Sequence, residues 1–160
     1  MKHLVIVAPL KPLTVGEGFA VSIFPLHVTL VPPFLVECDW PGLDAVVEAV
    51  AGSTDRLLAE VVGQEGFGPD GGIAVALVRP TGSLRNAHSR LTEALMPLGW
   101  TAREAHYNGS GFRPHITGND EGRVRRGECF ILGEMAIVEM LDPPIVRATY
   151  QLSGGGGSIA

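Results

Sequence analysis

The sequence predicts an α+β domain in which antiparallel strands pack on two helices. Three observations support this fold class. Short β-branched apolar runs are bounded by Pro, Gly and polar residues, two amphipathic helix patterns separate them, and the resulting order is β-β-α-β-β-α-β-β-β. Because the 160 residues contain no long internal linker, we expect one domain over residues 1–152, followed by a flexible Gly-rich tail over 153–160.

Seven segments are predicted to be strands. The second begins after Pro25 and is expected to stop at Pro32 and Pro33, because proline cannot donate a ladder hydrogen bond. The third and fourth form a hairpin around the Gly-Pro-Asp-Gly-Gly turn at 68–72. In chain order, the predicted strands cover residues 2–8, 26–31, 56–68, 71–80, 112–118, 129–141 and 145–153.

Two segments are predicted to be helices, because their apolar residues recur three and four positions apart. The first covers residues 41–51, with Asp39 as its N-cap. The second is capped by Ser83 and runs to about residue 98. His88 lies on the apolar side of this second helix, so we expect it to be a packed residue.

Composition argues against several function classes. The net charge of −5 argues against tight binding along a long nucleic acid, which requires many basic side chains at phosphates, but it permits a small nucleotide. No apolar run reaches the ~18 residues of a membrane span. Cys38 and Cys129 lack the spacing of a metal site and are expected to be free thiols. We therefore expect a cytoplasmic protein, a monomer, that uses no cofactor or metal.

Two segments separated by 88 positions carry the same pattern: His27, Val28 and Thr29 in the first, and His-Ile-Thr at 115–117 in the second. In a strand, residues i and i+2 share one face at ~6.5–7 Å. Each segment therefore presents an imidazole beside a hydroxyl. Two such strands facing each other would line a cleft with two imidazoles and two hydroxyls.

A phosphodiester suits such a cleft. Two threonine hydroxyls can donate hydrogen bonds to its non-bridging oxygens, and an imidazole with a pKa of ~6.5 can remove or supply a proton near neutral pH. A protonated imidazole also stabilises the charge of the transition state. A single His-x-Thr pair is more often a half-buried polar pair than a catalyst, but two matched pairs favour catalysis.

The segments His-Val-Thr-Leu and Pro-His-Ile-Thr-Gly resemble the paired H-x-T/S signatures of the 2H phosphoesterase superfamily. The resemblance covers residues 2–152 and implies a bilobal, pseudo-twofold α+β fold, with two antiparallel sheets lining a central cleft and two main helices outside. Members act on 2′,3′-cyclic phosphates, 2′-5′ linkages or 3′-5′ bonds, typically without metal.

Carried over to this chain, the resemblance implies that His27 and His115 are the acid and base, and that Thr29 and Thr117 hold the phosphate. The residues themselves leave open which histidine is the base; we expect His115 to take this role in opening a cyclic phosphate. The chain departs from many relatives at Gly118, where they have an apolar residue. This glycine is expected to end the strand early or to let a ligand approach the backbone.

Residues around the second motif are further candidates. Arg113 lies two before His115 and could bind phosphate from the same face, or be a solvated arginine. Tyr107 could stack on a nucleobase. A basic cluster follows the motif and could steer an anionic substrate, although a solvated turn is the commoner role; it consists of Arg123, Arg125 and Arg126.

The function expected from these patterns is a metal-independent phosphodiesterase acting on a small nucleotide or an RNA-terminal phosphodiester, either a 2′,3′-cyclic phosphate or a 2′-5′ linkage. One alternative is a phage-type nuclease that degrades 3′-5′ cyclic oligonucleotide immune signals. A second alternative, from another class, is a non-catalytic nucleotide-binding module. A third is a structural protein in which the two motifs coincide by chance.

Overall fold

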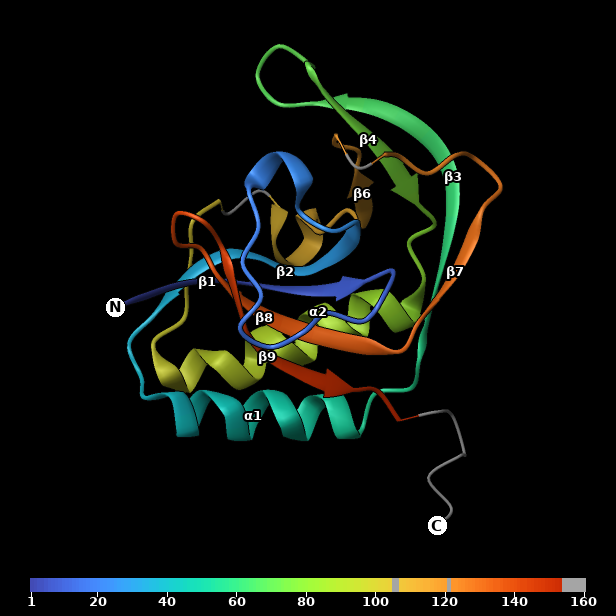
Figure 1. Ribbon diagram of the computed structural model, residues 1–160. Helices are drawn as coiled ribbons and strands as arrows, with labels where there is room; N and C mark the ends of the chain where they lie inside the picture. Colours follow the sequence, from blue (N-terminus) through green and yellow to red (C-terminus); the bar gives the residue numbers. More distant parts are fainter. Residues whose placement is uncertain (105–106, 121, 154–160) are drawn as a thin grey trace.

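The computed structural model describes residues 1–104, 107–120 and 122–153 (Figure 1). In this part of the chain, nine strands form one sheet, and every strand pair is antiparallel. The strands are β1 (Lys2–Pro9), β2 (His27–Val36), β3 (Leu57–Phe67), β4 (Ile73–Val78), β5 (Thr101–Ala102), β6 (His115–Thr117), β7 (Cys129–Leu132), β8 (Glu134–Glu139) and β9 (Ile145–Gln151). The α-helices are α1 (Trp40–Gly52) and α2 (Gly82–Leu95).

The order of strands in the sheet is symmetric about its centre. It runs β7-β3-β4-β6-β2-β1-β8-β9, with the short β5 paired to β2, so three strands flank each side of the central β6–β2 pair. The predicted α+β fold with two related halves is therefore confirmed. The two antiparallel parts are joined through β6 and β2 into one curled sheet, as Figure 1 shows.

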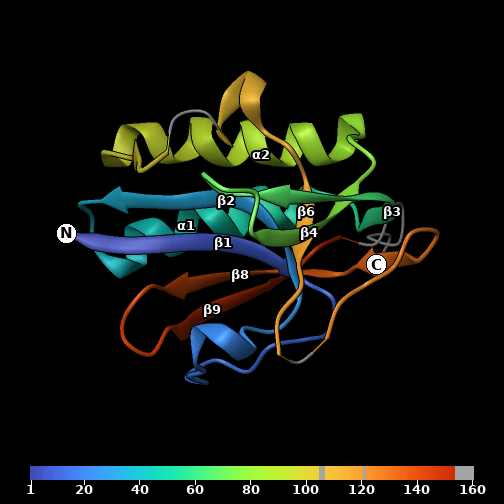
Figure 2. The ribbon, with the colours of Figure 1, turned by 90° about the horizontal axis from the view of Figure 1, so that it is seen from above.

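The two helices cover one face of this sheet. Alternate residues of β1 point to opposite sides: Leu4 and Ile6 are buried in the cluster that includes the helices, whereas Val5 and Val7 pack under the segment that follows β1. That segment contains a short 3₁₀ turn, η1 (Val21–Ile23). Figure 2 shows α2 on one side of the strands and η1 on the other. The motif-bearing centre of the sheet is thus supported from the helix side.

Both helices form close to where the sequence predicts them. Asp39 caps α1 as expected, since its carboxylate accepts a hydrogen bond from the Gly42 N–H at 2.8 Å. The prediction that Ser83 caps α2 is wrong, because the hydroxyl of Thr81 accepts from the Leu84 N–H at 3.2 Å instead. The helix also ends earlier, and residues 96–98 continue as a 3₁₀ turn.

The prediction that two prolines stop the second strand is wrong, because β2 continues to Val36. The pairing with β1 shifts by one residue at this point: Ile6 opposes Val31, whereas Leu4 opposes Phe34. Pro32 and Pro33 lie in this irregularity, where the regular ladder is interrupted and the missing N–H donors are tolerated.

The segment 129–141 is two strands and not one. β7 pairs with β3 at one edge of the sheet, and β8 pairs with β1 and β9 in the other half. The break falls at Gly133, next to Glu134, which is buried at the start of β8. The Glu134 carboxylate accepts hydrogen bonds from the Leu13 N–H at 2.9 Å and from the Gln151 amide at 3.2 Å. The chain crosses between the two halves of the sheet here.

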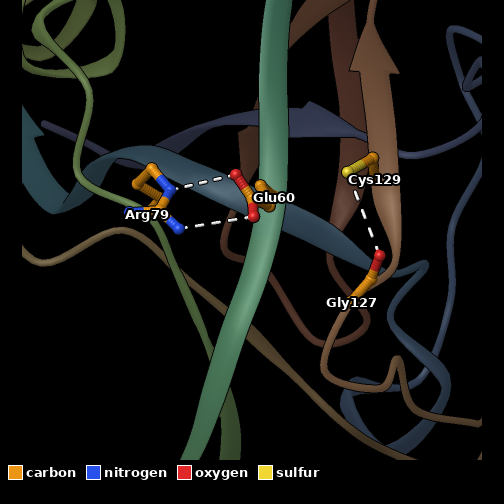
Figure 3. A network of polar contacts seen from close by, with 4 residues as sticks. All are labelled: Glu60, Arg79, Gly127 and Cys129. Atoms are coloured by element: carbon orange, nitrogen blue, oxygen red, sulfur yellow. Dashed lines mark hydrogen bonds and ion pairs between the residues drawn. The ribbon is translucent and has the colours of Figure 1, made fainter.

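Glu60 of β3 makes a polar contact on the exposed side of the strand, although its neighbours Ala59 and Val61 are buried in the core (Figure 3). The guanidinium of Arg79 donates to the carboxylate of Glu60 at 2.9 and 3.4 Å. On neighbouring β7, the thiol of Cys129 lies 4.0 Å from the Gly127 carbonyl, and both Cys129 and Cys38 are free, as predicted. Among the residues described, no helix has the length and apolarity needed to cross a membrane. The predicted tail falls almost wholly on residues 154–160, outside the described ranges.

Candidate active site

The two His-x-Thr segments lie side by side at the centre of the sheet. Val28 of β2 opposes Ile116 of β6 in an antiparallel pair. Continuing this register by one residue in each direction sets His27 opposite Thr117 and Thr29 opposite the second histidine. In an antiparallel pair, directly opposed residues have Cβ atoms ~4.5–5.5 Å apart, and diagonally related residues lie ~7–8 Å apart. The two histidines occupy such diagonal positions. The pattern is symmetric about the Val28–Ile116 pair.

The four polar side chains share the face that the helices do not cover. Val28 and Ile116 are buried in the helix-side cluster with exposed fractions of 0% and 1%. Because side chains alternate along a strand, the histidine and threonine on either side of each apolar residue project from the other face. All four flanking residues are half-buried.

Each imidazole is held by the same kind of hydrogen bond. The Nδ1 atom of His27 lies 2.7 Å from the Pro25 carbonyl oxygen, and the Nδ1 atom of His115 lies 2.7 Å from the Arg113 carbonyl oxygen. Since a carbonyl oxygen can only accept, each Nδ1 carries the proton. The Nε2 atom of each neutral ring therefore has a free lone pair that can accept a proton.

Each imidazole also lies against a phenylalanine ring. The centroids of Phe24 and His27 are 4.5 Å apart, and those of Phe67 and His115 are 4.6 Å apart. Phe24 precedes the first motif by three residues, whereas Phe67 comes from the end of β3. These rings limit the orientations of the imidazoles and reduce their contact with water.

A cavity of about 760 Å³ opens over the second motif. Its volume lies within the ~300–1,000 Å³ range of small-molecule sites. No lysine or arginine lines it among the described residues. The lining residues are Thr29, Pro32, Pro33, Phe67, Gly68, Pro69, Ile73, Val75, Glu104, Tyr107, His115 and Thr117.

The two histidines differ in their relation to this cavity. His115 lines it together with Thr29 and Thr117, whereas His27 lies outside the set of lining residues. Burial, above all, lowers the pKa of His27 to about 4; the Pro25 carbonyl opposes this shift, and the charge of His115 adds to it. The structure thus brings the two imidazoles close enough for their charges to interact.

Burial lowers the pKa of His115 as well, opposed by the carbonyl of Arg113 and assisted by its guanidinium. Because protonated His115 lowers the pKa of His27, the doubly protonated state of the pair is disfavoured. The arrangement favours states in which at least one imidazole is neutral.

Tyr107, which from the sequence could stack on a nucleobase, lies beside the second motif. It lines the cavity and stacks on Phe67, with ring centroids 5.9 Å apart and planes 16° from parallel. Arg113, by contrast, is outside the lining set. Its guanidinium binds the Glu65 carboxylate at 3.0 and 3.3 Å and lies 5.0 Å from the Phe67 ring centroid. Through these contacts Arg113 supports Phe67, which in turn contacts His115.

His88 is buried, as predicted, and connects the two motif regions. Its Nδ1 donates to the Leu30 carbonyl of β2 at 2.8 Å, and its Nε2 accepts from the Gly109 N–H at 2.9 Å. Its ring stacks on Phe112 with centroids 4.4 Å apart. His88 therefore ties β2 to the loop that leads into β6. His106 lies outside the described residues.

The strand β6 ends at Thr117, as expected from Gly118. A Cβ on Gly118 would lie 3.0 Å from the Cβ of Arg123, so glycine permits the following turn to fold back closely. The segment after the motif also contacts the segment before the first motif: the Asn119 amide donates to the Phe24 carbonyl, and the Asp120 N–H donates to the Ser22 carbonyl at 3.0 Å. These bonds hold the two motif regions together.

Several lining residues were missed by the sequence analysis. Phe67 and Val75 belong to the predicted hairpin, but their position beside the second motif depends on the β4–β6 pairing, in which Val75 opposes Thr117. The only sequence signal was the alternation of β4. Among the described residues, no group of three or more His, Cys, Asp or Glu side chains could hold a metal ion.

One known protein family matches the part of this chain that carries both motifs. The family model of the 2′-5′ RNA ligase superfamily matches residues 20–121, a stretch that contains both motifs. Comparison with curated protein sequences found no significant match.

Solved structures share the fold at low sequence identity. The TT0787 protein of Thermus thermophilus is 20% identical, with a TM-score of 0.59 and coverage of 95% of this chain and 98% of that one. A phosphoesterase structure is 13% identical, with a TM-score of 0.60 and the same coverage. Escherichia coli LigT complexed with NADP⁺ is 14% identical, with a TM-score of 0.59 over 95% and 98% of the two chains; it has also been solved with 3′-AMP.

Proposed function

Because the chain belongs to the 2′-5′ RNA ligase superfamily, we propose that it is a phosphodiesterase of the 2H type. Its proposed substrate is a small nucleotide or an RNA-terminal phosphodiester that contains a 2′,3′-cyclic phosphate or a 2′-5′ linkage. The observation that carries this proposal is the pairing of the two motifs around Val28 and Ile116, with both Nδ1 atoms bonded to carbonyl oxygens. That arrangement leaves two Nε2 atoms for proton transfer on one face of the sheet.

The proposed reaction needs one neutral and one protonated imidazole. In opening a cyclic phosphate, water attacks phosphorus while a neutral Nε2 removes its proton. The bond from phosphorus to one ribose oxygen breaks, and the protonated imidazole donates its Nε2 proton to that oxygen. The hydroxyls of Thr29 and Thr117 donate hydrogen bonds to the non-bridging oxygens and stabilise their charge in the transition state. This route requires no metal.

The surroundings of the two imidazoles favour His27 as the base and His115 as the acid. His27, with a pKa of about 4, is neutral at physiological pH. His115 lines the cavity, so a bound phosphodiester anion acts on it directly and raises its pKa. This assignment reverses the expectation from the sequence, in which the residues themselves left the choice of base open.

The apolar part of the cavity supports a nucleotide as the ligand. Phe67 and Tyr107 provide stacked aromatic rings beside His115, and stacking on such a ring contributes ~1–3 kcal/mol per base. Escherichia coli LigT, with the same fold, has been solved with the nucleotides 3′-AMP and NADP⁺. We therefore place the base at Phe67 and Tyr107 and the phosphate between the motifs.

A substrate panel tests this proposal. The purified protein is incubated, with and without EDTA, with 2′,3′-cyclic nucleotides, 2′-5′-linked dinucleotides and 3′-5′ cyclic oligonucleotides. We expect turnover of a 2′,3′-cyclic or 2′-5′ substrate at the same rate in EDTA. Turnover of the cyclic oligonucleotides alone would replace this substrate class with the immune-signal alternative. Saturable binding without turnover of any substrate would favour a binding module, and loss of activity in EDTA would contradict the metal-free route.

A further inference from the structure

A second concave surface lies behind the β3–β4 hairpin, on the opposite face from the cleft. Ile73 and Val75 of β4 line the cleft, whereas Ala74 and Ala76 line two adjoining cavities of about 770 and 170 Å³. The two cavities share Gln64, Ala74, Arg123 and Val124. We call this surface, lined by Gln64, Glu65, Gly66, Gly71, Gly72, Ala74, Ala76, Ile116, Gly118, Asn119, Arg123, Val124 and Arg125, the hairpin groove.

The hairpin groove carries positive charge in a chain whose net charge is −5. Arg123 and Arg125 line it, and neither guanidinium makes an ion pair or hydrogen bond with another described residue. The groove has one acidic lining residue among those described, Glu65, and the guanidinium of Arg113 neutralises it through two hydrogen bonds. Two guanidiniums are therefore available to an anion.

The backbone around the two arginines is anchored. The Gln64 amide donates to the Val124 carbonyl at 3.3 Å, which ties the arginine-bearing turn to β3. Asn119 and Gly122 exchange backbone hydrogen bonds at 2.9 and 3.0 Å. A Cβ on Gly118 would crowd Arg123, so this turn depends on a glycine at the end of the motif strand.

The lining favours a phosphate attached to an organic group. A guanidinium matches phosphate oxygens with two parallel hydrogen bonds, and two guanidiniums can hold one phosphate from two directions. The smaller cavity beneath them is lined by the apolar side chains of Ala76, Ile116 and Val124, with Gln64 as a polar neighbour. An inorganic anion would leave this apolar part empty.

We propose that the hairpin groove is a second binding site, for a phosphate group of a nucleotide, separate from the cleft that holds the two histidines. The phosphate has two possible sources with the same chemistry: a free nucleotide, or a flanking phosphate of an oligonucleotide whose scissile bond lies in the cleft. The site does not depend on the catalytic assignment, because none of its arginines belongs to the two motifs.

Calorimetric titration with inorganic pyrophosphate tests the site without any catalysis. The His27→Ala/His115→Ala double variant, which lacks both imidazoles of the cleft, is expected to keep saturable binding of pyrophosphate. Adding Arg123→Ala and Arg125→Ala should weaken this binding at least ~10-fold. Arg126→Ala is the control, because it removes one positive charge from the same turn, as Arg123→Ala and Arg125→Ala each do, but Arg126 does not line the groove. It should change the affinity less than ~2-fold.

Two outcomes would overturn the proposal. The first is that neither the wild type nor the histidine double variant binds pyrophosphate, or that only the double variant fails to bind it. The second is that Arg126→Ala weakens pyrophosphate binding as much as the groove substitutions do, which would indicate diffuse electrostatic attraction alone. The source is then distinguished with the Arg123→Ala/Arg125→Ala variant. A free nucleotide predicts that the wild type binds two 3′-AMP molecules per chain and the variant one. If the phosphate belongs to an oligonucleotide substrate, the variant should have a KM raised ~10-fold for a substrate of several nucleotides and an unchanged KM for a dinucleotide. If the variant changes neither stoichiometry nor KM, the site is not used by nucleotides.

Discussion

The two halves of the candidate active site present the same groups in different surroundings. Both imidazoles donate from Nδ1 to a carbonyl at 2.7 Å, and both lie against a phenylalanine. His27, however, begins a ten-residue strand, while His115 begins a three-residue strand and faces the cavity. The surroundings, and not the motif itself, therefore determine that His115 faces the cavity and His27 does not.

This inequality suits a reaction that needs an acid and a base. Two imidazoles in identical surroundings would have the same intrinsic pKa, whereas burial lowers the pKa of His27 to about 4, and His115 alone of the two lines the cavity. The aromatic contacts also differ. Phe67 stacks on Tyr107, and the two rings form an aromatic platform, whereas Phe24 packs on Phe19 in the core. In the proposed function, the second half therefore supplies the nucleotide-binding surface.

Removal of either imidazole is expected to have the largest effect. His27→Ala and His115→Ala should each lower kcat at least ~10²-fold, the usual scale for lost acid or base assistance. Because the two act in one step, the double variant should lose far less than the product of the single losses. His3→Ala, which alters a histidine at the distant start of β1, is the control. Full activity in either single variant would show that the halves are not a catalytic pair.

Loss of either threonine hydroxyl should have a smaller effect. Thr29→Val and Thr117→Val each remove one donor to the phosphate, and we expect kcat/KM to fall ~10-fold or more, as for a lost hydrogen bond to a charged group. Thr29→Ser and Thr117→Ser retain the hydroxyl and should stay near wild type. Similar losses for the two positions would support a symmetric phosphate site; a loss at only one would restrict phosphate binding to that half.

The aromatic platform belongs to the second half alone. Tyr107→Ala should raise KM for a nucleotide substrate ~5- to 100-fold with little change in kcat, because stacking contributes to binding of ground and transition states alike. Tyr107→Phe retains the ring and should keep the wild-type KM. An unchanged KM in Tyr107→Ala would remove the platform and leave the phosphate as the main recognition element.

Much of this site was predictable because it depends on local pattern. The two His-x-Thr segments, the cap at Asp39 and the packing of His88 follow from spacing and residue type. What could not be predicted depends on pairing between distant strands. The irregularity at Pro32 and Pro33 requires knowledge of the β1 register, and the split at Gly133 requires knowing that β7 and β8 pair with different strands.

The residues that contact the candidate site residues could not be predicted from the sequence either. Arg113 was expected near the phosphate from alternation, but the Glu65 carboxylate on β3 binds its guanidinium. Phe67 lies 48 residues before His115 and reaches it only because β4 joins β3 to β6. Long-range pairing of this kind leaves no trace in residue spacing.

Titration of the imidazole signals by NMR tests the inequality of the two histidines most directly. Because folding lowers both pKa values, both rings should be neutral at pH 7 and become protonated only as the pH falls below the ordinary value of ~6.5. We predict that His27 titrates near 4, that His115→Ala raises the pKa of His27, and that bound 3′-AMP raises the pKa of His115. Equal titration of both rings near 6.5, with no response of either to the other or to nucleotide, would contradict the account.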